Sequence, residues 1–201
     1  MFSNNKFMSK KAAWEELANE MGARYVEGRL GYYDKVLINY KHWVFILDLF
    51  SRTNGKTRTI ETRLRVSFIN KKDFDLHIRN RNIFNKIIFL FKRNNVEIGQ
   101  MEIDNKYFVE TNDQSKAKEL LCNPDIRQIL DKVKGFNLEI VNGKGLLGTK
   151  FPEKINEMRL KTYGIIKDRN HLKLLIELYK LMLDRFIELG ITSDDAIDLI
   201  L

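Results

Sequence analysis

The sequence predicts an α+β fold, a largely antiparallel twisted sheet with helices packed on one side and a long amphipathic C-terminal helix. Two observations support this class. Between residues 24 and 79, short β-branched and aromatic segments are separated by turn signals, which is typical of an antiparallel meander of about five strands. Near the C-terminus, apolar residues from Leu172 to Leu189 recur at spacings of three and four, which is typical of a helix with one buried face.

The length of 201 residues predicts one domain, which we place at 9–201 behind a disordered leader at 1–8. With 44% apolar and 31% charged residues, the composition is that of a globular protein. The longest apolar runs, 43–47 and 87–91, are far shorter than the roughly 20 residues of a membrane-spanning helix. No signal peptide is visible. We therefore predict a cytoplasmic protein without a transmembrane segment. Any association with a membrane would be made through a partner.

The first predicted element is a helix over residues 10–21. Ser9 precedes it, and Gly22 follows as a terminator suited to the left-handed conformation. An apolar stripe that includes Trp14 and Leu17 predicts that this helix docks on the body of the protein.

Strands are predicted at 24–27, 35–40, 42–50, 57–69 and 74–79, and Asn54-Gly55 marks a hairpin turn within 51–56. The 57–69 strand alternates clearly. One face is mainly apolar, and the other carries Thr59, Glu61, Arg63, Arg65 and Ser67. This pattern predicts a strand with one buried and one solvated face.

Residues 97–130 combine a strand at 107–110, a polar turn at 111–115, and two helical segments split by Pro124. Asn123 is the expected cap of the second helix. A strand at 136–141 follows, with 146–150 as its possible hairpin partner, and 154–168 shows no clear period. We expect Asn170 to cap the last long helix, Gly190 to stop it and a short helix to begin near Thr192. Periodicity leaves 82–93 open between helix and strand.

Candidate catalytic and ligand sites are poor. Cys122 lies in an apolar helical context, typical of a core residue. Asp75 and His77 share a strand face, but a zinc site needs three or four ligands. The G-x-G-x-x-G match at 143–148 lacks the following helix that a dinucleotide site needs. The acidic pairs, including Glu102 with Asp104, are more typical of structural roles. We predict no catalytic residue, metal or cofactor.

The positive charge is concentrated in one region. The chain has a net charge of +8, and residues 41–93 alone hold 13 Lys/Arg against four Asp/Glu. The possible anion-binding residues are Arg58, Arg63, Arg65 and Arg79. Such a face attracts nucleic-acid phosphates or anionic lipid headgroups, although a solvated strand face without a ligand is the more common explanation.

Over residues 14–189 the chain resembles an uncharacterised prokaryotic domain family, found in archaea and bacteria and often carried behind membrane helices. The motifs that carry the resemblance are Trp14-x-x-Leu17-Ala18 with Gly22, Val26-Glu27-Gly28, Lys56-Thr57-Arg58-Thr59 with Thr62-Arg63, Glu97-Ile98-Gly99, Tyr107-Phe108-Val109 with Asn112-Asp113, Ala117-x-x-Leu120-Leu121 and Ile126-Arg127. The chain departs from the family at Ile103, where an aromatic residue is usual. The resemblance implies no activity and no catalytic residues.

Two functional hypotheses follow from the sequence. The first is a non-enzymatic binding or interaction module whose specific role and partner the sequence leaves open, a protein being one option. The second is a binder of nucleic acid or anionic surfaces through the basic meander of residues 41–93. An enzyme ranks third, because it would need a pocket that collects residues such as His77, Asp104, Asn112 and Asp113.

Overall fold

A computed structural model describes residues 9–29, 33–81, 95–133, 135–142 and 154–194. Its helices are α1 (Lys10–Met21), α2 (Met101–Lys106), α3 (Gln114–Leu121), α4 (Pro124–Lys132) and α5 (Arg169–Glu188). Its strands are β1 (Arg24–Val26), β2 (Lys35–Tyr40), β3 (Trp43–Asn54), β4 (Thr57–Ile69), β5 (Leu76–Asn80), β6 (Tyr107–Thr111), β7 (Phe136–Asn142) and β8 (Ile155–Tyr163).

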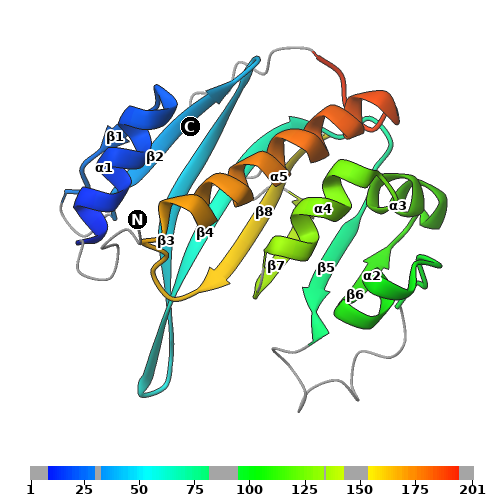
Figure 1. Cartoon of the computed structure of the whole chain (residues 1–201), viewed down its shortest axis with the longest axis horizontal. Coiled ribbons are helices and arrows are strands. Elements are labelled where there is room, and N and C mark those ends of the chain that lie inside the picture. Colours follow the sequence, from blue (N-terminus) through cyan, green and yellow to red (C-terminus); the bar gives the residue numbers. More distant parts are fainter. Residues whose placement is uncertain (1–8, 30–32, 82–94, 134, 143–153, 195–201) are drawn as a thin grey trace.

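The predicted α+β class is confirmed. The eight strands form one open antiparallel sheet in the order β1-β2-β3-β4-β8-β7-β5-β6. The five helices cover one face of this sheet (Figure 1). The longest, α5, lies across the sheet and buries eight side chains, among them Tyr179 and Phe186. The Tyr179 hydroxyl lies 2.6 Å from the Leu64 carbonyl and 2.9 Å from that of Met158, which ties α5 to two central strands.

The predicted N-terminal helix is confirmed at both ends. The Ser9 side chain accepts a hydrogen bond from the Ala12 amide, and Gly22 ends α1 in the left-handed conformation. Trp14 and Leu17 are fully buried. The predicted Asn123 cap and Pro124 start of α4 are also confirmed.

Several local predictions are wrong. The cap of α5 is Asp168, whose carboxylate accepts from the Asn170 and His171 amides. The hairpin turn is formed by Gly55 and Lys56, one residue later than predicted, because β3 continues through Asn54 and Gly55 takes a positive φ. Residues 101–106, for which no helix was predicted, form α2.

The meander prediction holds for β1 to β4 but not for β5. Strands β8 and β7 lie between β4 and β5. The sequence showed no period at 154–168, yet β8 at 155–163 lies between β4 and β7 in the sheet. The ambiguous segment 82–93, the proposed partner strand 146–150 and the leader 1–8 lie outside the described residues, as does the chain beyond Asp194.

Candidate binding surface

The predicted anion-binding arginines do not share one exposed face. Arg63 and Arg65 are each only 8% exposed, so the solvated face expected for β4 is wrong at these positions. Arg63 makes a two-pronged contact with Asp48 on β3, from Nε to Oδ1 and from Nη2 to Oδ2, each at 2.9 Å. Arg65 donates from Nη2 to the same carboxylate at 2.8 Å and from Nη1 to Glu157 on β8 at 3.1 Å.

These pairs continue across the sheet. The Glu157 carboxylate also accepts from Arg159 Nε at 2.7 Å, and Arg159 Nη1 lies 3.6 Å from Glu139 Oε1 on β7. Lys161 contacts the same Glu139. We call this set the charge ladder; its members are Asp48, Arg63, Arg65, Glu139, Glu157, Arg159 and Lys161.

Strand register explains the order of the ladder. Arg63 lies directly opposite Lys161, and Arg65 directly opposite Arg159. Like charges at opposed positions destabilise a sheet, but Asp48, Glu139 and Glu157 stand beside them and neutralise them. Because Arg63 and Arg65 already have carboxylate partners, the ladder is poorly suited to hold an external anion.

Arg79, the fourth predicted residue, lies on β5, on the same face of the sheet as the ladder, because it is opposite Asn137, which is opposite Lys161. Its side chain is 14% exposed and pairs with Glu110 on β6. Neighbouring His77 lies with Nε2 2.7 Å from Asn137 Oδ1 and Nδ1 3.7 Å from Glu110. Arg79 therefore shares the face of Arg63 and Arg65, but like them it already has a carboxylate partner.

The remaining predicted residue, Arg58, lies on an extension of the β3–β4 hairpin. Pairing of β2 with β3 ends at Leu47 and pairing of β8 with β4 begins at Thr62, with one further contact of Gly164 to Glu61 and Ile60. From residues 52 and 59 to the turn, the described residues of β3 and β4 pair only with each other, and the hairpin projects from the rest of the sheet (Figure 1). We define the arm as residues 52–59.

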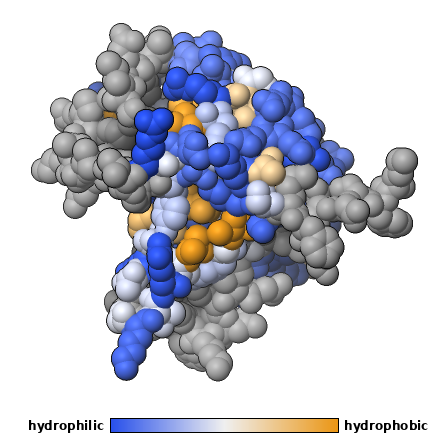
Figure 2. All heavy atoms as spheres, turned by 90° about the vertical axis from the view of Figure 1, so that its left-hand side faces the viewer, coloured by the Kyte–Doolittle hydropathy of each residue, from blue (hydrophilic) through white to orange (hydrophobic). Residues whose placement is uncertain are grey.

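Every charge on the arm is positive. Arg52, Lys56 and Arg58 are exposed, and the arm contains no acidic residue. In the space-filling view the projecting arm is coloured blue to near-white (Figure 2). Within the described residues, none of the three cations has an ion pair. This surface is open to an external anion in a way that the ladder is not.

Two aromatic residues, Tyr33 and Phe50, lie near the base of the arm. Tyr33 accepts a hydrogen bond from Arg58. Hydrogen bonds with Ser51, the larger cause, and with Arg58 lower the pKa of Tyr33. On the face bearing the ladder, Phe50 is 38% exposed, and the Arg63 guanidinium lies 4.6 Å from the centre of its ring. Phe50 therefore lies against the ladder, two residues before the arm begins.

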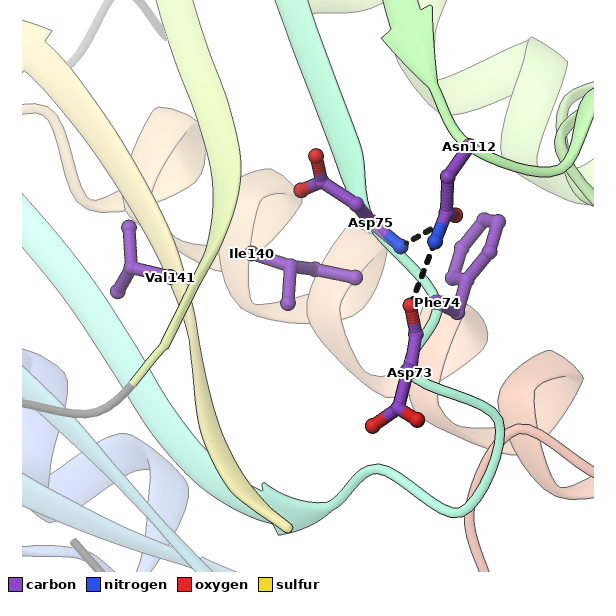
Figure 3. Close-up of a pocket in the computed structure, with 6 residues that line it drawn as sticks. All are labelled: Asp73, Phe74, Asp75, Asn112, Ile140 and Val141. Carbon is purple, nitrogen blue, oxygen red and sulfur yellow. Dashed lines mark hydrogen bonds between the residues drawn. The ribbon is translucent and has the colours of Figure 1, made fainter. Parts of the chain in front are cut away.

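A pocket of about 550 Å³ lies at the opposite end of the sheet. Its lining combines apolar side chains with the carboxylates of Asp73 and Asp75 and the amide of Asn112 (Figure 3). Asn112 holds the loop together: its Nδ2 donates to the Asp73 carbonyl at 2.6 Å, and its Oδ1 accepts from the Asp75 amide at 2.8 Å. Among the residues that the structure describes, the lining includes no histidine, serine or cysteine.

The pocket does not bring together the four residues that the sequence offered for an enzyme site, His77, Asp104, Asn112 and Asp113. Of the four candidates, only Asn112 lines it. The Asp104 carboxylate accepts from the Ile98 and Gly99 amides, and Asp113 caps α3. His77 faces Asn137.

The other candidate sites give little chemistry. In the described part of the chain, no group of three or more His, Cys, Asp or Glu side chains could hold a metal ion. Cys122 is a free thiol that packs against the core. The G-x-G-x-x-G segment at 143–148 lies outside the described residues. No helix of the described ranges is long and apolar enough to cross a membrane.

Fold and surface together define an α+β protein with a one-sided helical layer and a basic β-arm. No family model, curated protein or solved structure matches this chain. The resemblance to the uncharacterised prokaryotic domain family stays a prediction.

Proposed function

We propose that this chain is a non-enzymatic binding module that takes a polyanionic partner on its arm. One observation carries the proposal. Three cations, Arg52, Lys56 and Arg58, stand on an eight-residue projection that contains no carboxylate, whereas the buried arginines of the same hairpin have carboxylate partners. A partner that supplies negative charge can therefore bind the arm without breaking an ion pair.

The architecture of the arm supports the same proposal. A two-stranded ribbon is at best marginally stable in water by itself. The arm buries little apolar surface, since the described side chains from Arg52 to Arg58 are exposed. Its projection adds little to the core but places three cations away from the sheet, which favours a role in binding.

The test is a fluorescence-anisotropy titration of the full chain with a labelled polyanion, a 20-nucleotide single-stranded DNA or its duplex, over a series of salt concentrations. Binding that weakens steeply with salt is expected. The triple variant R52Q/K56Q/R58Q should lose most of the affinity. The matched control K72Q/K118Q/K132Q removes the same charge from residues outside the arm and should bind almost as well as the native chain.

Two results would overturn the proposal. One is the absence of binding to either DNA form at low salt. The other is an equal loss in the arm and control variants, which would trace binding to net charge alone.

A further inference from the structure

The two arginines of the arm project from opposite faces of the ribbon. Arg52 is paired with Thr59, and Thr53 with Arg58. Directly opposed residues share a face, and successive residues along a strand alternate. Arg52 and Thr59 therefore lie on one face and Arg58 with Thr53 on the other, while Lys56 lies in the turn at the tip.

We infer that the arm enters the major groove of B-form duplex DNA, an inference that rests on the proposed function above. A groove places phosphates on both sides of whatever enters it, so both faces of the arm meet negative charge at once. A flat anionic surface, such as a lipid bilayer, faces only one side of a ribbon. The cations on two faces and at the tip therefore match a groove better than a plane.

The dimensions agree with this partner. The major groove is about 12 Å wide and about 8.5 Å deep, and it admits a two-stranded ribbon. Three residues on each strand of the arm, 52–54 and 57–59, extend about 10 Å, and the two strands lie about 4.8 Å apart. The minor groove, about 6 Å wide, is too narrow for the paired strands and their side chains.

The arm also indicates the mode of recognition. Its side chains are three cations with threonines, groups that bind phosphate oxygens. Arginine and lysine in the major groove can also donate to guanine edges. We expect contacts to the phosphates to dominate binding and any sequence preference to favour G·C pairs. Duplex RNA should bind less well, because its major groove is deep and narrow.

The experiment compares the single variants R52Q and R58Q with the control K72Q on one 20-bp duplex DNA. Each arginine that contacts a phosphate should reduce the slope of log K against log salt by about 0.9, and the double variant by about 1.8. The K72Q slope should equal that of the native chain. The same sequence as single-stranded DNA, as duplex RNA, and as a duplex with bulky adducts filling the major groove should each bind at least tenfold more weakly.

The outcomes separate this inference from the proposed function. Tight, arm-dependent binding to single strands, to duplex RNA or to anionic lipid vesicles at the level of the DNA duplex would overturn the groove inference and leave the proposed function standing. An unchanged slope of log K against log salt on duplex DNA in either R52Q or R58Q would also overturn it, because the arginine on that face would then contact no phosphate. Absence of binding to every polyanion would overturn both. Thermal unfolding of each variant checks that the chain remains folded.

Discussion

The buried part and the projecting part of the β3–β4 hairpin place their arginines in opposite environments. Where β3 and β4 lie inside the sheet, Arg63 and Arg65 are buried and share the carboxylate of Asp48. Where the same strands leave the sheet, Arg52 and Arg58 are exposed and have no carboxylate partner in the described residues. The difference shows that positive charge in a strand marks a binding surface only where neighbouring strands do not already neutralise it.

The largest expected effect comes from removing the shared carboxylate of the ladder. Asp48→Ala leaves Arg63 and Arg65 buried with one partner fewer. We expect the free energy of unfolding to fall by about 3–5 kcal/mol, the usual cost of an uncompensated buried charge. Urea unfolding followed by circular dichroism measures it. R52Q on the arm is the control and should stay within about 0.5 kcal/mol of the native chain. A loss below about 1 kcal/mol for Asp48→Ala would show that the ladder is open to water.

A smaller effect of opposite sign is expected at Ser67, on the same face as Arg65. Its hydroxyl is buried and has no hydrogen-bond partner. Ser67→Ala removes an unsatisfied polar group, so we expect the free energy of unfolding to rise by up to about 1 kcal/mol. The same urea titration measures the change, with Ser115→Ala at an exposed serine as the comparison. Clear destabilisation by Ser67→Ala would mean that a bound water satisfies the hydroxyl.

Shortening the hairpin should leave the fold almost unchanged. Replacing residues 52–59 by Asn-Gly joins Ser51 to Ile60 through a tight turn suited to a hairpin. Because the ladder and the core lie outside the arm, we expect a change in unfolding free energy within about 1 kcal/mol. The same variant should lose DNA binding. Loss of the folded state, seen as a missing cooperative transition, would give the arm a structural role.

The smallest effect concerns the contact between Tyr33 and Arg58 at the base of the arm. Because the pKa of Tyr33 is lowered in the folded state, ionised Tyr33 stabilises the fold as pH rises through that pKa toward its ordinary value near 10. Below that pKa the contribution is absent.

Ultraviolet absorbance during an alkaline titration follows this ionisation. Burial raises the pKa of Tyr107 to about 12, which separates it from Tyr33. R58Q should raise the pKa of Tyr33 only part of the way, since the hydrogen bond with Ser51 remains. An unchanged titration in R58Q would show that the contact does not persist in solution. Tyr33→Phe identifies the signal.

Prediction from sequence succeeded where local signals were sufficient. The α1 helix has its cap, apolar stripe and terminating glycine within 14 residues, and the β4 strand has a clear alternation. It failed for β8, whose inward face carries only Met158 and Leu160 as apolar residues between polar ones. Charged residues such as Glu157 obscure the alternation that would predict this strand, and Glu157 is stabilised by Arg65, 92 residues away.

The sequence by itself determined the α+β class, the long C-terminal helix and the location of the positive charge within residues 41–93. Those features depend on periodicity and composition, which neighbouring residues set. Only the tertiary structure decided which arginines are neutralised and which project into solvent. That outcome depends on the insertion of β8 and β7 beside β4, which brings Glu157 and Glu139 to the face of Arg65 and leaves the arm without a neighbouring strand.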